Sequence, residues 1–129
     1  MKKLFASNLY VALLHYPVIN KNGDTIASAV TNLDLHDISR VAKTYGVKAF
    51  YVVTPLIDQQ ALVNRIVSHW VSGVGSRYNP KRRAALELIR IKTALDGVID
   101  HIKAKEKVTP VTVVTGADQR LMNDRQKIG

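Results

Sequence analysis

A short polar stretch gathers side chains that could bind a ligand or accept a proton. Asn32, Asp34, His36 and Arg40 all occur within nine residues. An arginine near a helix start can hold a phosphate or a base edge through its planar set of donors, and imidazole accepts a proton near neutral pH. The alternatives are a surface ion pair of Arg40 with Asp37 or Asp34, which is worth little, and a solvent-facing His36.

A second group of candidates is a basic segment that contains one aromatic ring. Its side chains are those of Arg77, Tyr78, Lys81, Arg82 and Arg83. Clustered cations contact phosphates, and an aromatic ring can stack on an unpaired base. The chain carries a formal net charge of +9 and has a pI near 10.0, which favours a polyanionic partner, chiefly nucleic acid, either RNA or DNA. The alternative is a solvated basic loop on a soluble protein.

The remaining histidines are weaker candidates. His15 follows a predicted strand, where ligands collect in α/β proteins, although a buried, hydrogen-bonded imidazole is an equally good reading of that position. His69 and His101 fall inside predicted helices, far from any strand end. The four histidines lack metal-ligand spacing and the chain has no cysteine, so we expect no metal site.

The elements that must position these residues centre on one helix–strand unit, residues 31–55. Asn32 and Asp34 are the candidate N-caps, and Gly46 suits a left-handed C-cap. An apolar helical stripe is formed by Leu35, Ile38, Val41, Ala42 and Tyr45. Ala49–Val53 is continuously apolar, as in a strand that is covered on both faces.

Strands and helices alternate along the rest of the chain. The other predicted strands are Leu9–His15, Leu88–Lys92 and Pro110–Thr115. The other predicted helices run from an Asp58 cap to Ser72, from Asn79-Pro80 to Leu86, and from a Thr93 cap to Lys105. Residues 18–30 are interpreted as a loop, although the Asn22-Gly23 pair is also a hairpin signal.

This alternation predicts one α/β domain, residues 1–129, with a mainly parallel sheet and helices on both faces. We expect the tail, residues 121–129, to fray because it has no apolar period. No apolar stretch reaches membrane-spanning length, and the N-terminus lacks a cleavage site for a signal peptide. Together with the absence of cysteine, this predicts a cytoplasmic protein that does not contact a membrane.

Several stretches resemble one known family. They are YVALLHYPVINKNGDTIASAVTNLDLHDISRVAKTYGV, YVVTPL, YNPKRRAALELIRIK and VVTGADQR. The chain from Leu9 to Arg120 is similar to the small SPOUT-class family of S-adenosylmethionine-dependent RNA methyltransferases, relatives of the bacterial tRNA guanine-N1 methyltransferase. The resemblance implies a Rossmann-like N-terminal portion, S-adenosylmethionine as cofactor, methyl transfer to a tRNA or rRNA base, and a homodimer.

The resemblance also suggests roles for individual residues. Arg40 falls on an arginine that the class uses for substrate RNA or catalysis, Asp34 falls on the class's asparagine, and His36 falls on its small glycine. Arg40 and Asp34 are therefore the catalytic candidates. The substrate-binding candidates are His15, Asn32, His36, Arg77, Tyr78, Lys81, Arg82 and Arg83.

One part of the class pattern has no counterpart in this sequence. SPOUT proteins bind their cofactor in a C-terminal trefoil knot, and residues 121–129 contain neither a strand nor a cofactor loop. We therefore expect the knot to be absent, the cofactor to bind weakly or not at all, and self-association to be absent or non-native. A non-catalytic RNA-binding module is the alternative function. A small-molecule enzyme with phosphate at the Asn32 helix start is a third reading, which Asp34 and Asp37 disfavour.

Overall fold

A parallel sheet forms the centre of the protein. The computed structural model describes residues 8–15, 18–19, 21–26, 30–73 and 75–115. Within these ranges the main sheet contains β1 (Tyr10–Leu14), β4 (Ala49–Val53) and β5 (Ile89–Lys92), in the order β1-β4-β5. Both pairings are parallel, with Tyr51 opposite Ala12 and Arg90. Every residue of β4 is buried, which confirms the prediction of a central strand covered on both faces.

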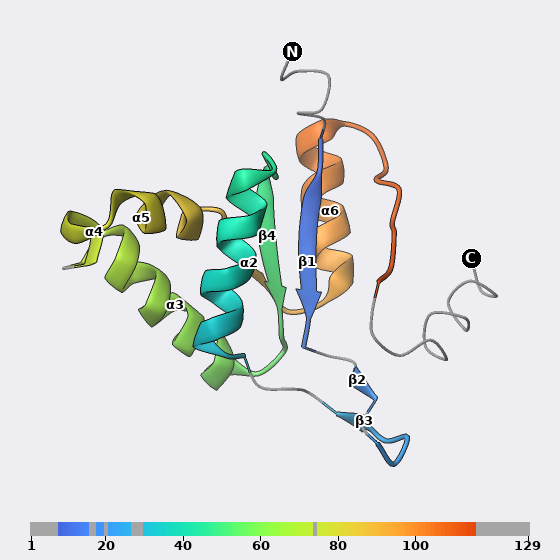
Figure 1. Cartoon of the computed structure of the whole chain (residues 1–129). Helices are drawn as coiled ribbons and strands as arrows, with labels where there is room; N and C mark the ends of the chain where they lie inside the picture. The colour runs from blue at the N-terminus through green and yellow to red at the C-terminus, as the bar shows by residue number, and fades with distance from the viewer. Residues whose placement is uncertain (1–7, 16–17, 20, 27–29, 74, 116–129) are drawn as a thin grey trace.

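Helices cover both faces of this sheet (Figure 1). One face carries α2 (Asn32–Thr44), α3 (Ile57–Val71), the short α4 (Gly75–Tyr78) and α5 (Pro80–Leu86). The other face carries α6 (Leu95–Glu106). The predicted α/β class is therefore confirmed, and the arrangement is consistent with the Rossmann-like portion implied by the resemblance.

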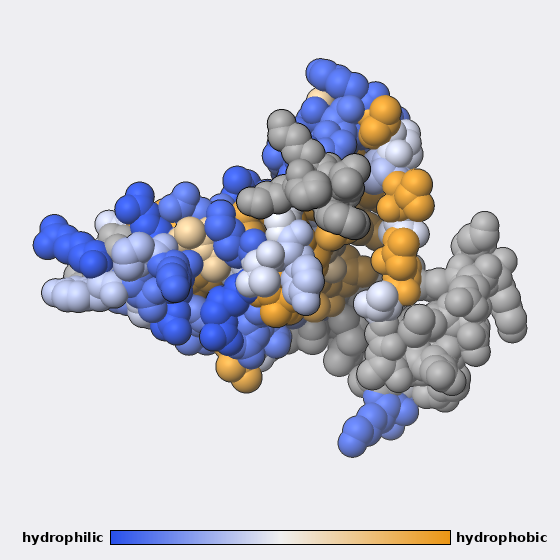
Figure 2. All heavy atoms as spheres, turned by 45° about the horizontal axis from the view of Figure 1, so that its top comes forward, coloured by the Kyte–Doolittle hydropathy of each residue, from blue (hydrophilic) through white to orange (hydrophobic). Residues whose placement is uncertain are grey.

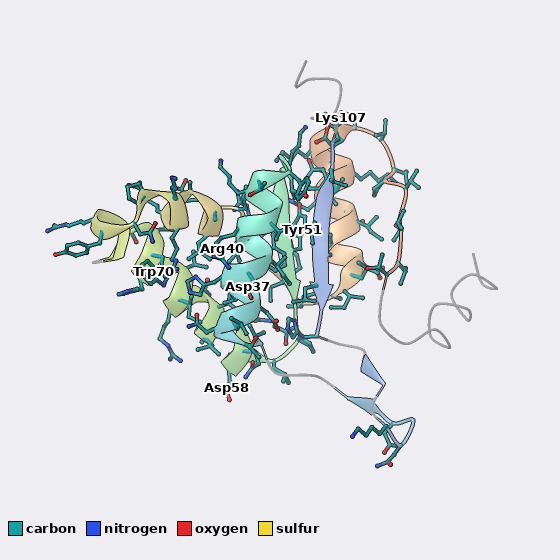
Figure 3. All side chains as sticks on the ribbon, viewed as in Figure 1. Asp37, Arg40, Tyr51, Asp58, Trp70 and Lys107 are labelled. Carbon is teal, nitrogen blue, oxygen red and sulfur yellow. The ribbon has the colours of Figure 1, made fainter. Side chains whose placement is uncertain are left out.

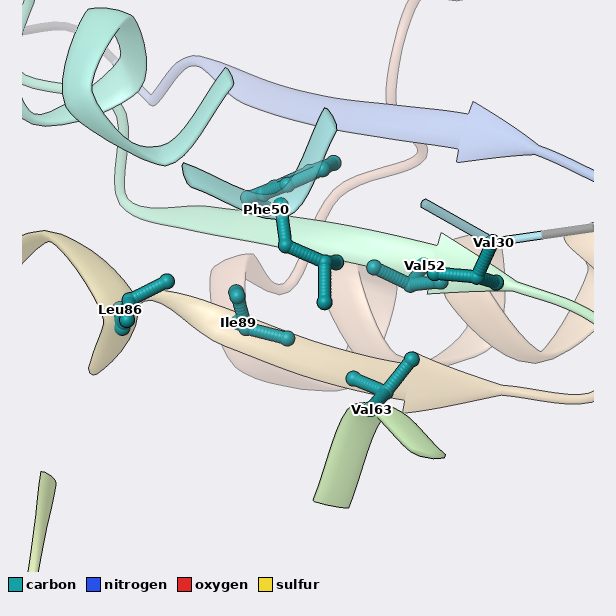
Figure 4. Close-up of a cluster of buried hydrophobic side chains, with 7 residues drawn as sticks. Val30, Phe50, Val52, Val63, Leu86 and Ile89 are labelled. Carbon is teal, nitrogen blue, oxygen red and sulfur yellow. The ribbon is translucent and has the colours of Figure 1, made fainter. Parts of the chain in front are cut away.

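Alternation along β4 divides the core into two clusters. Phe50 and Val52 point to the α2 side, where a buried cluster is completed by Val30, Leu35, Val63, Leu86 and Ile89 (Figure 4). Ala49, Tyr51 and Val53 point to the α6 side and pack with Val98 and Ile102. Successive side chains of a strand point to opposite faces of the sheet. A continuously apolar strand therefore contributes side chains to the core clusters on both faces. Truncating a fully buried ring such as that of Phe50 costs about 3–5 kcal/mol.

The helix starts differ from the predicted caps at three of four positions. Thr31, with extended backbone, caps α2 by accepting a hydrogen bond from the Asp34 N–H at 3.1 Å, so Asn32 and Asp34 are wrong as caps. Asp58 lies in the first turn of α3, and α6 begins after Ala94 instead of Thr93. The cap is the residue at which the backbone changes from extended to helical. Several adjacent polar residues are suitable caps by residue type, so the sequence alone does not identify which of them is the cap. The Asn79 cap of α5 is confirmed.

The buried face of α2 is rotated from the predicted stripe. Leu35, Ser39 and Ala42 are its buried residues, whereas Val41 and Tyr45 are 57% and 72% exposed. The stripe predicted through Val41 and Tyr45 is therefore wrong at its C-terminal half. A small polar Ser39 lies where the helix meets the sheet, which a search for apolar spacing does not detect. Gly46 has the predicted positive φ, +73°.

Two predictions for the remaining segments are corrected. β2 (Val18–Ile19) and β3 (Thr25–Ile26) pair as an antiparallel hairpin, with Gly23 at φ +84°, so the Asn-Gly turn signal outweighed the poor alternation beside it. Residues 110–115 form no strand, and Val111 and Val113 are 93% and 81% exposed. High β propensity does not suffice without an edge to pair with. The predicted frayed tail lies outside the described residues.

None of the helices in the described ranges has the length and apolar character needed to cross a membrane.

Candidate functional site

A shallow cleft of about 520 Å³ lies on the outer side of the helical layer formed by α2, α3 and α5. Its lining residues are Asn32, Leu33, His36, Asp37, Arg40, Trp70 and Arg82. The polar start of α2 and the basic segment of α5 are far apart in sequence, and this cleft brings them together. Three of the predicted candidates from the first group and one from the second therefore share one surface.

Trp70 is the residue that joins the two groups. The Arg82 guanidinium carbon lies 4.7 Å from the centroid of the indole ring, and the rings of His36 and His69 approach it edge-on at 5.7 and 4.9 Å. A guanidinium over an indole face is held by the negative face of the ring. Figure 3 shows Trp70 projecting from α3 beside the helix that carries Asp37 and Arg40.

Sequence reasoning missed Trp70 as a site residue. Its spacing from Leu62 and Ile66 predicts an apolar helix face, and the ring does pack against the core. However, it is only half-buried, and its remaining surface lines the cleft. The available signal was that this is the chain's single tryptophan and lies shortly before a basic segment.

Gly75 fixes the position of the indole. A Cβ built on Gly75 would lie 2.6 Å from Cε3 of Trp70, far inside van der Waals contact. Gly75 is itself buried and begins α4. The ring therefore lies directly on the backbone at this point, and a larger residue would displace it toward the cleft. This close approach is a packing reason for a glycine at this position.

Arg40 forms the surface ion pair that was the alternative reading of its position. Its Nη2 lies 2.7 Å from Oδ1 of Asp37, and the two side chains are 61% and 50% exposed. A pair this exposed contributes at most about 1 kcal/mol, because water competes for both charges. Arg40 can therefore exchange this carboxylate for a phosphate at little cost.

His36 lies between the two arginines of the cleft. Partial burial, followed by the charges of Arg82 and Arg40, lowers the pKa of His36, and Asp37 opposes this only in part. Among the described residues its buried Nδ1 has no hydrogen-bond partner. The cleft thus contains an imidazole ring that is neutral at neutral pH, with its Nδ1 buried, beside two permanent cations. An anion entering the cleft would gain from both guanidinium groups.

His15 and Asp34 lie apart from the cleft lining. His15 is 3% exposed at the end of β1, and its backbone N–H donates to the carbonyl of Val53 at 2.8 Å. Burial lowers the pKa of His15, and the nearby Asp34 carboxylate opposes that shift. The two residues are therefore close to one another under the start of α2. They adjoin the cleft at Asn32 and do not line it.

The other basic candidates form an exposed ridge on α4 and α5, next to the cleft. Tyr78 is 79% exposed, and Arg77, Lys81 and Arg83 are also exposed. Arg83 pairs with Glu87 at 3.1 Å across one helical turn. Hydrophilic side chains cover this end of the molecule in Figure 2. Arg82 of the cleft belongs to the same helix as Lys81 and Arg83 of the ridge, so the two groups of cations adjoin at α5.

Comparison with known proteins identifies the family. A family model described as SAM-dependent RNA methyltransferase matches residues 8–127. Two curated tRNA (guanine-N(1)-)-methyltransferases, from Oleidesulfovibrio alaskensis and Nitratidesulfovibrio vulgaris, are 40% and 44% identical to the chain over 110 residues. An uncharacterized protein of Aquifex aeolicus is 37% identical over 110 residues.

The matches cover most of this chain and only a part of the relatives. Each one spans 85% of the chain, but only 26% of either methyltransferase and 54% of the Aquifex protein. The tRNA methyltransferase activity therefore belongs to proteins of which the chain matches about a quarter of the length. Because the family model extends over nearly all of the described residues, the chain belongs to the family of SAM-dependent RNA methyltransferases.

Proposed function

We propose that this chain forms an RNA-binding surface of an S-adenosylmethionine-dependent methyltransferase, and that the reaction served is methyl transfer to a tRNA or rRNA base. The observation that carries the proposal is the cleft in which Arg40, His36 and Arg82 converge around Trp70. The family membership and the net charge of +9 support it. A tRNA or rRNA substrate would place the protein in the cytoplasm.

The cleft suits a bent or single-stranded phosphate backbone. Arg40 and Arg82 provide positive charge at the opening, where either guanidinium group can hydrogen-bond a phosphate oxygen. Arg82 is held in place from two directions, because its backbone N–H donates to Oδ1 of Asn79 at 3.0 Å and its guanidinium lies over Trp70. Such pre-positioning reduces the side-chain entropy that RNA binding costs.

The neighbouring ridge extends the same surface. Arg77, Lys81 and Arg83 would contact successive phosphates, and the exposed ring of Tyr78 can stack on a base that has left the helix. Enzymes that modify a base need it unstacked, so an aromatic platform beside the phosphate contacts fits this chemistry. In this proposal Arg40 contacts the substrate and Asp34, in the first turn of α2 beside His15, is the candidate proton acceptor.

The described residues do not fit the cofactor. The cleft is flanked by two guanidinium groups, which repel a sulfonium cation. A second cavity of about 340 Å³, between β1, α6 and residues 108–113, is mainly apolar, and the Tyr10 hydroxyl and Glu106 carboxylate at one end are hydrogen-bonded to each other. Glu106 also binds Lys48 at 2.8 Å. We therefore assign no residue of this chain to S-adenosylmethionine.

Single alanine variants of the cleft test the proposal. We expect Arg40→Ala and Arg82→Ala each to weaken binding of a labelled tRNA, measured by fluorescence anisotropy. Arg82→Ala should cost more, because Arg82 is fixed by the indole whereas Arg40 must leave Asp37. The matched control is Lys103→Ala, which removes an exposed cation from α6 on the opposite face of the sheet. Equal losses in all three variants would show that charge alone, and not the cleft, binds RNA.

A further inference from the structure

The Arg82 side chain has the indole of Trp70 on one side and the cleft on the other. Its guanidinium carbon lies 4.7 Å from the ring centroid, and the residue is only partly buried. Its backbone N–H donates to Oδ1 of Asn79 at 3.0 Å, and the indole itself lies on the backbone of Gly75. A planar cation held in this way can take a second flat group on its free side, because guanidinium planes stack on rings.

Two other residues of the cleft lining suit a nucleobase better than a phosphate. Leu33 is 69% exposed, and its apolar surface can pack against a base ring but cannot bind a phosphate. Asp37 lies on the same helix and also lines the cleft (Figure 3). Its carboxylate accepts hydrogen bonds from the N–H groups of a base edge, whereas it repels a phosphate. The lining therefore favours a flat, neutral group that carries N–H donors.

Cations beside the cleft remain available for the phosphates that flank such a base. Arg40 pairs with Asp37 at 2.7 Å, and both side chains are at least half exposed, so the pair costs little to break. When Asp37 accepts a hydrogen bond from a base, Arg40 is released for a neighbouring phosphate. Lys81 and Arg83 lie on either side of Arg82 in α5 and are exposed. They can contact the phosphates of adjacent nucleotides.

We propose that the cleft binds one unpaired base of single-stranded RNA, stacked on the outer side of the Arg82 guanidinium. This proposal rests on the proposed RNA-binding function and adds the form of RNA that the surface selects. A base inside a double helix is already stacked on both faces and cannot enter the cleft, so the cleft discriminates against duplex RNA. The cleft volume of about 520 Å³ falls within the roughly 300–1,000 Å³ that is usual for small-ligand pockets.

Abasic RNA separates base stacking from phosphate contacts. The probes are a short labelled single strand, an abasic strand of the same length, and the first strand paired in a duplex, and their affinities are measured by fluorescence anisotropy at one salt concentration. We expect wild type to bind the intact strand at least about fivefold more tightly than the abasic strand, which is the lower end of what one stacked base contributes. The duplex should also bind more weakly than the intact single strand.

Arg82→Lys tests the stacking surface, because lysine keeps the positive charge and lacks the plane. It should lower the preference for intact over abasic RNA at least about fivefold, and it should bind the abasic strand within about twofold of wild type. Arg65→Lys is the matched control, because Arg65 is an exposed arginine of α3 outside the cleft lining. It should leave the preference unchanged. Circular dichroism of each variant shows whether its fold is retained.

The results separate failure of the base site from failure of RNA binding. Equal affinities of wild type for intact and abasic strands, or an unchanged preference in Arg82→Lys, would overturn the base site and leave RNA binding through phosphates intact. A stronger preference in Arg82→Lys would also overturn it, because the base would then stack directly on the indole of Trp70. A chain that binds neither strand would contradict the proposed function, and the base site with it.

Discussion

Gly75→Ala is predicted to destabilise the protein mainly through overlap with the indole ring of Trp70, while the His69 ring lies 3.1 Å from the added Cβ. The added Cβ would lie 2.6 Å from Cε3 of Trp70, about 0.8 Å closer than the ordinary contact limit of 3.4 Å. Helical backbone at this position accepts alanine, since the φ of Gly75 is not positive. The cost therefore comes from overpacking, which is about 1–3 kcal/mol when neighbours must shift. For a domain of this size that lowers the Tm by roughly 4 °C per kcal/mol.

Gly97 is the control position, and the fluorescence emission of Trp70 is the assay. At Gly97 in α6 an added Cβ meets only the Lys92 side chain, at 3.6 Å or more, so Gly97→Ala should be neutral or stabilising by up to about 1 kcal/mol. Trp70 is the sole tryptophan, so its emission reports ring displacement directly. We expect Gly75→Ala to shift that emission and to lower the Tm.

A double-mutant cycle isolates the contact. Trp70→Leu removes the ring atoms that the new Cβ would strike, so Gly75→Ala should cost much less in that background. If alanine at Gly75 and alanine at Gly97 had equal effects on Tm, or if the cost at Gly75 persisted without the indole, the packing account of the cleft would be refuted.

Three further predictions concern ionisation and the cofactor. Hydrogen bonds from Lys48 and then Tyr10 lower the pKa of Glu106 below 4.5, so Glu106→Gln should reduce stability above about pH 4.5 and lose that effect in more acidic solution, as pH-dependent denaturation would show. Phosphate beside the arginines of the cleft should oppose the lowering of the His36 pKa, so RNA affinity should increase as the pH falls from neutral toward that lowered pKa, and His36→Asn but not His69→Gln should remove that dependence. Calorimetry of this chain with S-adenosylmethionine should show no binding, and a micromolar affinity near −8 kcal/mol would contradict the absence of a fitting site.

Local patterns predicted the elements that carry their own signals. β4 was recognisable because Ala49–Val53 has no polar interruption, and α5 because an asparagine cap precedes proline. Gly46 was recognisable because a left-handed C-cap favours glycine. In each case the physical cause lies within a few residues of the feature, so sequence neighbours suffice to reveal it.

Features that depend on distant partners could not be predicted in this way. The cleft requires α5 to pack across α2 and α3, and no spacing within one helix specifies that Arg82 will lie on Trp70. Val41 was assigned to the core because its spacing fits a helical face, but the sheet contacts a face centred on Ser39. Residues 110–115 have strand-forming side chains and no paired edge. Tertiary contacts decide each of these outcomes.

The salt dependence of RNA binding tests the central claim most directly. The affinity of the wild-type chain for tRNA should fall steeply with salt, and replacing Lys81, Arg82 and Arg83 together by alanine should flatten the logarithmic slope by about two units, since each phosphate contact contributes roughly 0.7–0.9. Lys103→Ala should leave the slope unchanged. An unaltered affinity and slope in the triple variant would contradict the assignment of this surface to RNA.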